Sequence, residues 1–148
     1  MLAPRASPDA AHEESDERGR SMADDVSAED EPLVLIEDIG PVRRLTMNRP
    51  GALNALSGGL IDALSQAFWA AGEDPDVRVI ILRGAGRAFC AGYDLNEDAA
   101  EGVLDARHWH ASLSASTERM LEIVDCPKPV IASVQSYCLA GGTDLMLA

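Results

Sequence analysis

The sequence contains few basic residues, few cysteines and few aromatic residues, and each shortage excludes a class of protein. Lysine and arginine number 12 against 25 aspartates and glutamates, so the net charge is -13. Without a basic stripe to neutralise phosphates, a nucleic-acid partner is not expected. The three cysteines (Cys90, Cys126 and Cys138) have no CxxC spacing and are odd in number. We therefore expect a reduced intracellular protein without a disulfide framework.

Long hydrophobic runs are also missing. No apolar stretch approaches the roughly 20 residues of a membrane-spanning helix. The first residues lack the apolar segment of a secretory signal and are too acidic for a transit peptide. We expect no membrane partner and a cytoplasmic location.

The chain divides into an acidic tail and a folded part. Residues 1–31 carry a net charge of -7 and almost no large apolar side chains. Such a segment cannot bury enough surface to offset its ordering entropy, so it is predicted to be disordered. Met22 is an alternative start of the protein. Residues 32–148 are long enough for about one domain, with a core made mostly of Ala, Val, Ile and Leu.

The folded part alternates between strand and helix patterns. The runs VRVIILRG and PVIASVQS are continuously apolar and typical of strands covered on both faces. The order predicts an α/β fold with a partly parallel sheet. The expected elements are strands 33–38 and 42–48, a helix capped by Ser57 and ended by Gly72 and Pro75, a strand 77–84, a helix over 109–124, a strand 129–136 and a helix beginning at 140.

Two glycine-containing loops follow the apolar strands, where α/β sheets gather their ligands. One loop reads FCAGYDL and the other SYCLAGGTD. Gly141 and Gly142 stand at the start of the last helix, whose first N–H groups have no internal partner and carry the positive end of the helix dipole. These donors can meet an oxyanion. A simple tight turn is the alternative, and the phosphate motifs GxxxxGK[ST] and GxGxxG are absent.

The segments RPGALNAL, AFCAGYDL and PKPVIASVQSYCLAGGTDL together resemble the N-terminal signatures of the crotonase superfamily, the enoyl-CoA hydratases and isomerases. The resemblance covers about residues 33–148. It implies a spiral of ββα units, truncated after the helix start that bears Asp144, and a homotrimer or hexamer for the full-length protein. It also implies an acyl-CoA substrate and fatty acid metabolism. No metal or organic cofactor is implied, because coenzyme A is part of the substrate.

The resemblance assigns roles to individual positions. Tyr93 and Gly141 correspond to the two backbone N–H donors of the family's oxyanion hole, and Ala140 replaces a usual glycine. Many relatives carry a charge where Gly51 stands, so Arg49 or Arg87 could replace it as a phosphate contact. The positions that the resemblance assigns to substrate binding are Gly51, Ala52, Leu53, Ala91, Asp94, Leu95, Tyr137 and Leu139.

Asp144 is the expected catalytic carboxylate. Hydratases of this family usually use two glutamates, and the first corresponds to Asp144, which we expect to be partly desolvated and to act as general acid or base. The second would lie some twenty residues further on, beyond Ala148. The chain thus looks like the N-terminal half of a crotonase, and we expect it to be inactive alone.

The simplest expected reaction is hydration of a 2-enoyl-CoA. Double-bond isomerisation, thioester hydrolysis, ring-forming synthesis and a non-catalytic CoA-binding fragment or pseudoenzyme remain open. Other candidates are weaker: His108 and His110 have a spacing that points their rings apart on a helix, so surface histidines beside a buried Trp109 are expected rather than a metal site. Cys90 is expected to fill the core, and Asp94 could instead cap the next turn. The serines lack a GxSxG elbow.

Overall fold

A four-stranded sheet organises the folded part of the chain. The computed structural model describes residues 31–95 and 106–148. Its sheet has the order β1-β2-β3-β5, in which β1 is antiparallel to β2 and the other pairs are parallel. These strands are β1 (Val34–Ile39), β2 (Val42–Met47), β3 (Val79–Gly84) and β5 (Val130–Ser133). The prediction of an α/β fold with a partly parallel sheet is confirmed.

A second, smaller sheet pairs the segments that precede the two glycine loops. It consists of the parallel strands β4 (Ala88–Cys90) and β6 (Tyr137–Cys138). The sequence pattern missed both strands, because segments of three and two residues are too short for a recognisable alternation. Their pairing brings together loops that are about fifty residues apart in the sequence.

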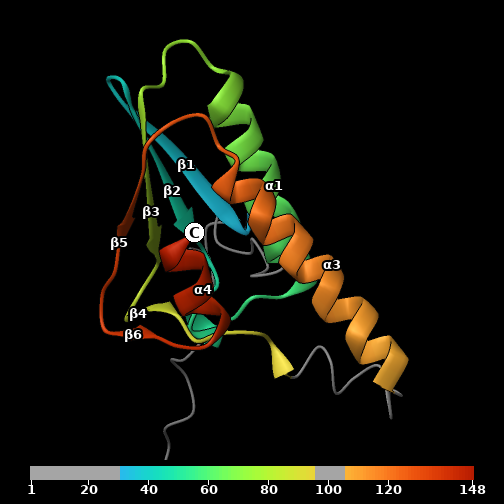
Figure 1. Cartoon of the computed structure of the whole chain (residues 1–148). Coiled ribbons are helices and arrows are strands. Elements are labelled where there is room, and N and C mark those ends of the chain that lie inside the picture. Colours follow the sequence, from blue (N-terminus) through green and yellow to red (C-terminus); the bar gives the residue numbers. More distant parts are fainter. Residues whose placement is uncertain (1–30, 96–105) are drawn as a thin grey trace, which may run out of the picture. The chain divides into compact units, whose positions relative to one another are not determined.

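Two long helices lie on the same side of the four-stranded sheet and pack against each other (Figure 1). They are α1 (Gly58–Glu73) and α3 (Ala106–Val124); the chain also forms a short 3-10 helix, η1 (Pro50–Ala52), and the helix α4 (Gly141–Leu147). Ser57 caps α1 as predicted, because its Oγ accepts a hydrogen bond of 3.2 Å from the N–H of Leu60.

The end of α1 differs from the prediction. Gly72 lies inside the last turn, and the helix ends after Glu73 with Asp74 as its C-cap. A Cβ on Gly72 would lie 3.3 Å from Cδ of Pro127. Glycine therefore serves close packing at this position rather than termination of the helix.

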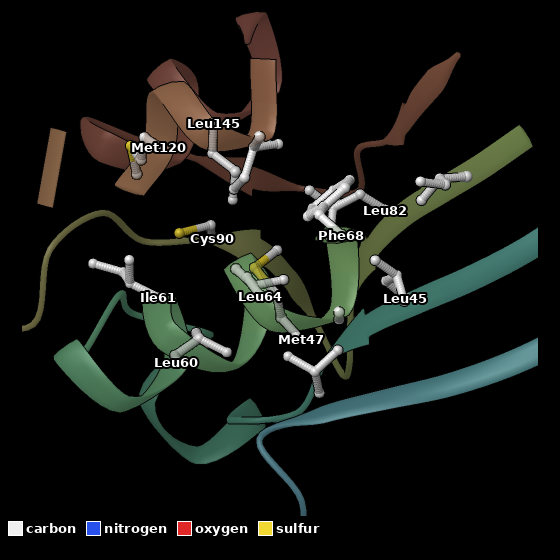
Figure 2. Packing of buried hydrophobic residues seen from close by; sticks show 14 of the residues in the cluster. Leu45, Met47, Leu60, Ile61, Leu64, Phe68, Leu82, Cys90, Met120 and Leu145 are labelled. Atoms are coloured by element: carbon white, nitrogen blue, oxygen red, sulfur yellow. The ribbon is translucent and has the colours of Figure 1, made fainter. Parts of the chain in front are cut away.

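The core lies between the sheet, α1, α3 and α4, and Figure 2 shows their apolar side chains meeting there. The buried core consists mostly of Ala, Val, Ile and Leu side chains, as the composition predicts, with Phe68, Phe89, Met47, Met120 and Cys90 as the other members. Its largest side chains that are almost wholly inaccessible to solvent include Phe89, Leu45, Met47, Leu60, Leu64, Ile80 and Leu82.

Two strands are less buried than their apolar sequences predict. In β3 buried residues alternate with partly exposed ones, and in β5 both Val130 and Ile131 are exposed, Ile131 to 54%. The expectation that both strands are covered on both faces is therefore wrong for the described part of the chain. The physical reason is that α1 and α3 cover the same side of the sheet.

Some expectations fall outside the described residues or side chains. These are the disorder of residues 1–31, apart from Glu31, and the orientations of His108 and Trp109. The residues from Glu31 to Ala148 form one unit by their internal contacts. No helix in the described ranges has the length and apolar character needed to cross a membrane.

Candidate active site

The loop that contains Tyr93 is tied to the segment after η1 by backbone hydrogen bonds. Leu56 donates its N–H to Gly92 O at 2.7 Å, and Asp94 donates its N–H to Leu56 O at 3.0 Å. Ala91 donates to Leu53 O at 3.1 Å. The structure therefore joins two of the three sequence segments on which the family resemblance rests.

The loop before α4 joins the same place. Leu139 donates its N–H to Cys90 O at 3.0 Å. A Cβ on Gly92 would lie 3.1 Å from Leu139 O and 3.6 Å from the nitrogen of Gly141. Gly92 also has φ +97, a value that L side chains rarely adopt. Glycine at this position lets the two loops touch through their backbones.

The backbone N–H groups of Tyr93 and Gly141 are the two predicted donors. The parallel bridge to Leu56 uses the carbonyl of the residue before Tyr93 and the N–H of the residue after it, so the N–H of Tyr93 points away from that bridge. Gly141 is the first residue of α4, where N–H groups have no partner within the helix. Among residues 31–95 and 106–148, no acceptor is recorded for either group.

The two consecutive glycines of α4 have separate packing roles. A Cβ on Gly141 would lie 2.8 Å from Cε2 of Tyr93, and a Cβ on Gly142 would lie 2.8 Å from Cβ and 2.9 Å from the carbonyl oxygen of Cys90. Real Cβ atoms essentially never approach so closely. The pair is therefore needed for α4 to begin directly against the Tyr93 loop.

Cys90 is buried in the core, where the sequence placed it as an apolar filler. Its Sγ accepts a hydrogen bond of 3.5 Å from the N–H of Gly92. Burial raises the pKa of the thiol above its ordinary value of 9.0, because the thiolate is poorly solvated there, and the hydrogen bond offsets only part of this effect. The thiol thus stays protonated at neutral pH, which suits a structural role better than a nucleophilic one.

The side chain of Tyr93 extends from its loop toward α3 and α4. Its hydroxyl lies 3.9 Å from Sδ of Met120 on α3. Burial raises the pKa of the phenol, and the negative charge of Asp144 raises it further. Asp144 lies in the first turn of α4, three residues after Gly141.

Asp144 differs from the expectation in one respect. We expected partial desolvation, but its side chain is exposed in the structure. Asp144 O accepts a backbone hydrogen bond from Ala148 at 3.0 Å, so the residue is part of a regular helical turn. Within the part of the chain that the structure describes, the carboxylate is directed to solvent rather than into the core.

Asp94 and Arg49 form an ion pair beneath the loop. Arg49 Nη2 lies 2.8 Å from Asp94 Oδ2, and Asp94 is only 8% exposed. Nη1 of Arg49 donates to Ala55 O at 2.6 Å. The pair therefore fastens the Tyr93 loop to the segment 51–56, whereas the sequence assigned substrate contacts to Asp94 and a possible phosphate contact to Arg49.

Asn54 is a structural residue of the site that the sequence analysis missed. It has no exposed surface and adopts φ +56, in the left-handed region that Asn tolerates better than most residues. Its Oδ1 accepts from Arg49 N at 2.9 Å, and its Nδ2 donates to Ala85 O at 2.9 Å and Ala88 O at 2.8 Å. The sequence did contain a sign of this role, because Asn54 is the one polar residue in the otherwise apolar segment GALNAL.

Ala140 occupies a strained position at the N-cap of α4. Its φ of 44° and ψ of -123° lie in a region that glycine adopts more readily. Alanine at this position therefore has an energetic cost, which the glycine implied by the resemblance would avoid.

The remaining predicted substrate-binding residues lie around these loops and are mostly accessible. Leu53 and Ala91 are partly exposed. The exposed ones are Gly51, Ala52, Leu95, Tyr137 and Leu139.

A cavity of about 740 Å³ lies elsewhere, between the C-terminal half of α1 and the segment from Asp125 to Pro127. None of the predicted site residues lines it. This cavity is therefore separate from the two glycine loops.

Comparisons with known proteins identify the family to which the chain belongs. The family model for enoyl-CoA hydratase/isomerase matches residues 39–148. The chain is 36% identical over 120 residues to enoyl-CoA hydratase EchA19 of Mycobacterium tuberculosis, covering 81% of the chain and 45% of that relative. It is 44% identical over 114 residues to 3-hydroxyisobutyryl-CoA hydrolase 1 of Arabidopsis thaliana, covering 74% of the chain and 29% of that relative.

Solved structures of enoyl-CoA hydratases also resemble this chain. An enoyl-CoA hydratase/isomerase from Xanthobacter autotrophicus Py2 superposes with a TM-score of 0.72 at 35% identity, over 77% of this chain and 42% of that one. An enoyl-CoA hydratase from Mycobacterium smegmatis gives a TM-score of 0.69 at 44% identity, over 78% and 44%. The chain thus spans less than half the length of these relatives.

Proposed function

Because this chain belongs to the enoyl-CoA hydratase/isomerase family of the crotonase superfamily, we propose that it binds the thioester carbonyl of an acyl-CoA between the N–H groups of Tyr93 and Gly141. The observation that carries the proposal is the contact between the two loops. Their backbones meet at Gly92, and both N–H groups lack an acceptor within the described residues. No metal or organic cofactor is required by this chemistry.

The two donors act on charge that develops during the reaction. When a proton leaves the α-carbon, or when water adds at the β-carbon, negative charge accumulates on the thioester oxygen. Preorganised N–H donors stabilise that charge, and removal of one such donor costs roughly 10²–10³ in rate. Gly141 adds the positive end of the α4 dipole, although α4 is short.

Asp144 is the proposed acid or base. Its carboxylate lies one turn after Gly141 and close enough to Tyr93 to raise the pKa of the phenol. Aspartate is shorter than glutamate by one carbon–carbon bond, about 1.5 Å, so the substrate must approach α4 more closely than it would with glutamate. Hydration of a 2-enoyl-CoA is the simplest reaction that this arrangement supports.

Other reactions in which negative charge develops on the thioester oxygen remain alternatives. Relatives of this chain include a hydrolase and a dienoyl-CoA isomerase, the latter from peroxisomes of Arabidopsis thaliana and 37% identical over 119 residues. A non-catalytic CoA-binding protein is the alternative from another class. A homotrimer or hexamer is the proposed assembly of the intact protein.

Replacement of Gly141 tests the proposal in the intact protein. Gly141→Pro removes the N–H at the first helical position, where proline is tolerated. Turnover of crotonyl-CoA is expected to fall by about two orders of magnitude or more. Gly141→Ala is the matched control, because it introduces the same Cβ against Tyr93 but keeps the N–H.

The comparison between the two variants decides the outcome. We expect Gly141→Ala to lose less activity than Gly141→Pro, with both variants folded by circular dichroism. Equal turnover of the two folded variants would show that the N–H of Gly141 takes no part in the reaction.

A further inference from the structure

The ring of Tyr93 closes the space beside Gly141. Three atoms along one edge of the ring, Cδ2, Cε2 and Cζ, lie 2.8–3.1 Å from the point that a Cβ on Gly141 would occupy. At its far end the hydroxyl reaches Sδ of Met120 at 3.9 Å. The ring thus spans from the first residue of α4 to α3.

The backbone and the side chain of Tyr93 are held by different contacts. The N–H is positioned by hydrogen bonds of its neighbours Gly92 and Asp94 with Leu56. The ring contacts Gly141 and Met120 instead. A smaller side chain at this position would therefore leave the N–H in place while opening the space that the ring fills.

The phenol is neutral at physiological pH. Burial raises its pKa above the ordinary value of 10.0, and the charge of Asp144 acts in the same direction. The ring is therefore an uncharged surface, partly buried, that an acyl chain can contact without displacing a hydrated ion.

We propose that the side chain of Tyr93 limits the length of the acyl group by filling the space between Gly141 and Met120. This inference rests on the proposed function, since it takes the thioester oxygen to be held by the N–H groups of Tyr93 and Gly141. The first carbons of the acyl chain then lie only a few bonds, of about 1.5 Å each, from the ring. Short acyl chains fit, and long ones need the volume that the ring occupies.

The variants Tyr93→Ala and Tyr93→Phe distinguish the effect of the ring from the effect of its hydroxyl group. The readout is the ratio of kcat/KM for trans-2-decenoyl-CoA to that for crotonyl-CoA in the intact protein. We expect Tyr93→Ala to raise this ratio about tenfold or more, because a few methylene groups in an apolar pocket discriminate at least to this extent. Tyr93→Phe keeps the ring and is expected to leave the ratio unchanged.

Trp69→Ala is the control for loss of an aromatic side chain. Trp69 lies on α1, is 73% exposed and belongs to none of the segments of the site. Its replacement is expected to leave the ratio as in the wild type. If Tyr93→Ala does not fold, Tyr93→Leu opens less space and is expected to raise the ratio by a smaller factor.

Binding distinguishes failure of this inference from failure of the proposed function. Dissociation constants of the saturated butyryl-CoA and decanoyl-CoA are measured by competition for the wild type and Tyr93→Ala. A wild type that binds and converts acyl-CoA, with a length preference that Tyr93→Ala leaves unchanged, overturns the role of the ring alone. A wild type that neither binds nor converts any acyl-CoA overturns the proposed function and this inference with it.

Discussion

Asn54 stabilises the base of the site through three hydrogen bonds in a position without solvent access. Asn54→Ala would leave the N–H of Arg49 and the carbonyl of Ala85 without this partner, whereas Ala88 O would keep its hydrogen bond of 3.2 Å from Gln135 Nε2. Because buried polar groups without partners cost about 1–3 kcal/mol each, we expect the free energy of unfolding to fall by about 2–4 kcal/mol. Denaturant unfolding measures the change.

Asn48 provides the matched control for this substitution. Its Nδ2 also donates two hydrogen bonds, to Glu31 Oε2 at 3.3 Å and to Pro32 O at 3.1 Å, but these lie in an exposed region where water can replace them. Asn48→Ala should therefore cost less than about 1 kcal/mol. Equal losses for the two variants would show that Asn54 does not organise the loops.

At the scale of single residues, the sequence revealed residues that act through their backbone conformation or backbone N–H group. Gly141 was recognisable because glycine at a helix start permits close approach, and the structure places Tyr93 against it. The sequence did not reveal the partners of Asn54 or of Gln135, whose Nε2 donates to Gly84 O at 2.6 Å. Apart from Arg49, which is five residues before Asn54, these partners lie 31 to 51 residues away, and no local pattern specifies them.

At the scale of elements, the start of α4 carries strain that a single substitution can relieve. Ala140 has φ 44°, and a conformation of this kind costs about 1–3 kcal/mol for a residue with a side chain. Replacing alanine by glycine also lowers the free energy of unfolding by about 0.4–1 kcal/mol, because glycine gives the unfolded chain more conformational freedom. We therefore expect Ala140→Gly to raise the free energy of unfolding by about 1 kcal/mol, as measured by denaturant unfolding.

Ala70→Gly shows the opposite effect of the same chemical change. Ala70 is exposed in the interior of α1, where glycine costs about 1 kcal/mol relative to alanine. We therefore expect Ala140→Gly to raise the free energy of unfolding and Ala70→Gly to lower it. A loss of stability in Ala140→Gly as large as that in Ala70→Gly would contradict the strained geometry at the start of α4.

The elements themselves were predictable to different degrees. The helix α1 was readable from its cap and its apolar spacing, β1 and β2 from strand-length segments on either side of Gly40, and β3 from a continuous apolar run. The two-stranded sheet β4–β6 was not, because its strands are defined by their pairing rather than by their composition. The burial of β5 was overestimated, because an apolar run shows that a strand can be covered on both faces but not that other elements cover it.

At the scale of the whole molecule, the fold brings two glycine loops from distant parts of the sequence to one place. The parallel pairs β2–β3 and β3–β5 align the strands that precede these loops, and the β4–β6 pair joins the loops themselves. This convergence follows from sheet topology. The sequence suggested it through the rule that ligands gather where loops leave the strands of an α/β sheet, and through the family resemblance. The central claim is that the joined loops present two N–H donors to a thioester oxygen.

Isotope-edited infrared spectroscopy tests this claim most directly. Butyryl-CoA labelled with ¹³C at the thioester carbonyl is bound to the intact protein, and the carbonyl stretch is obtained from the difference from the unlabelled complex. Two preorganised donors polarise the carbonyl more than bulk water does. We predict a bound carbonyl frequency below that in water. Gly141→Ala introduces a Cβ that must displace the Tyr93 ring but keeps the N–H, so it should retain more of this shift than Gly141→Pro. A bound frequency equal to that in water, or one that Gly141→Pro leaves unchanged, would contradict the account.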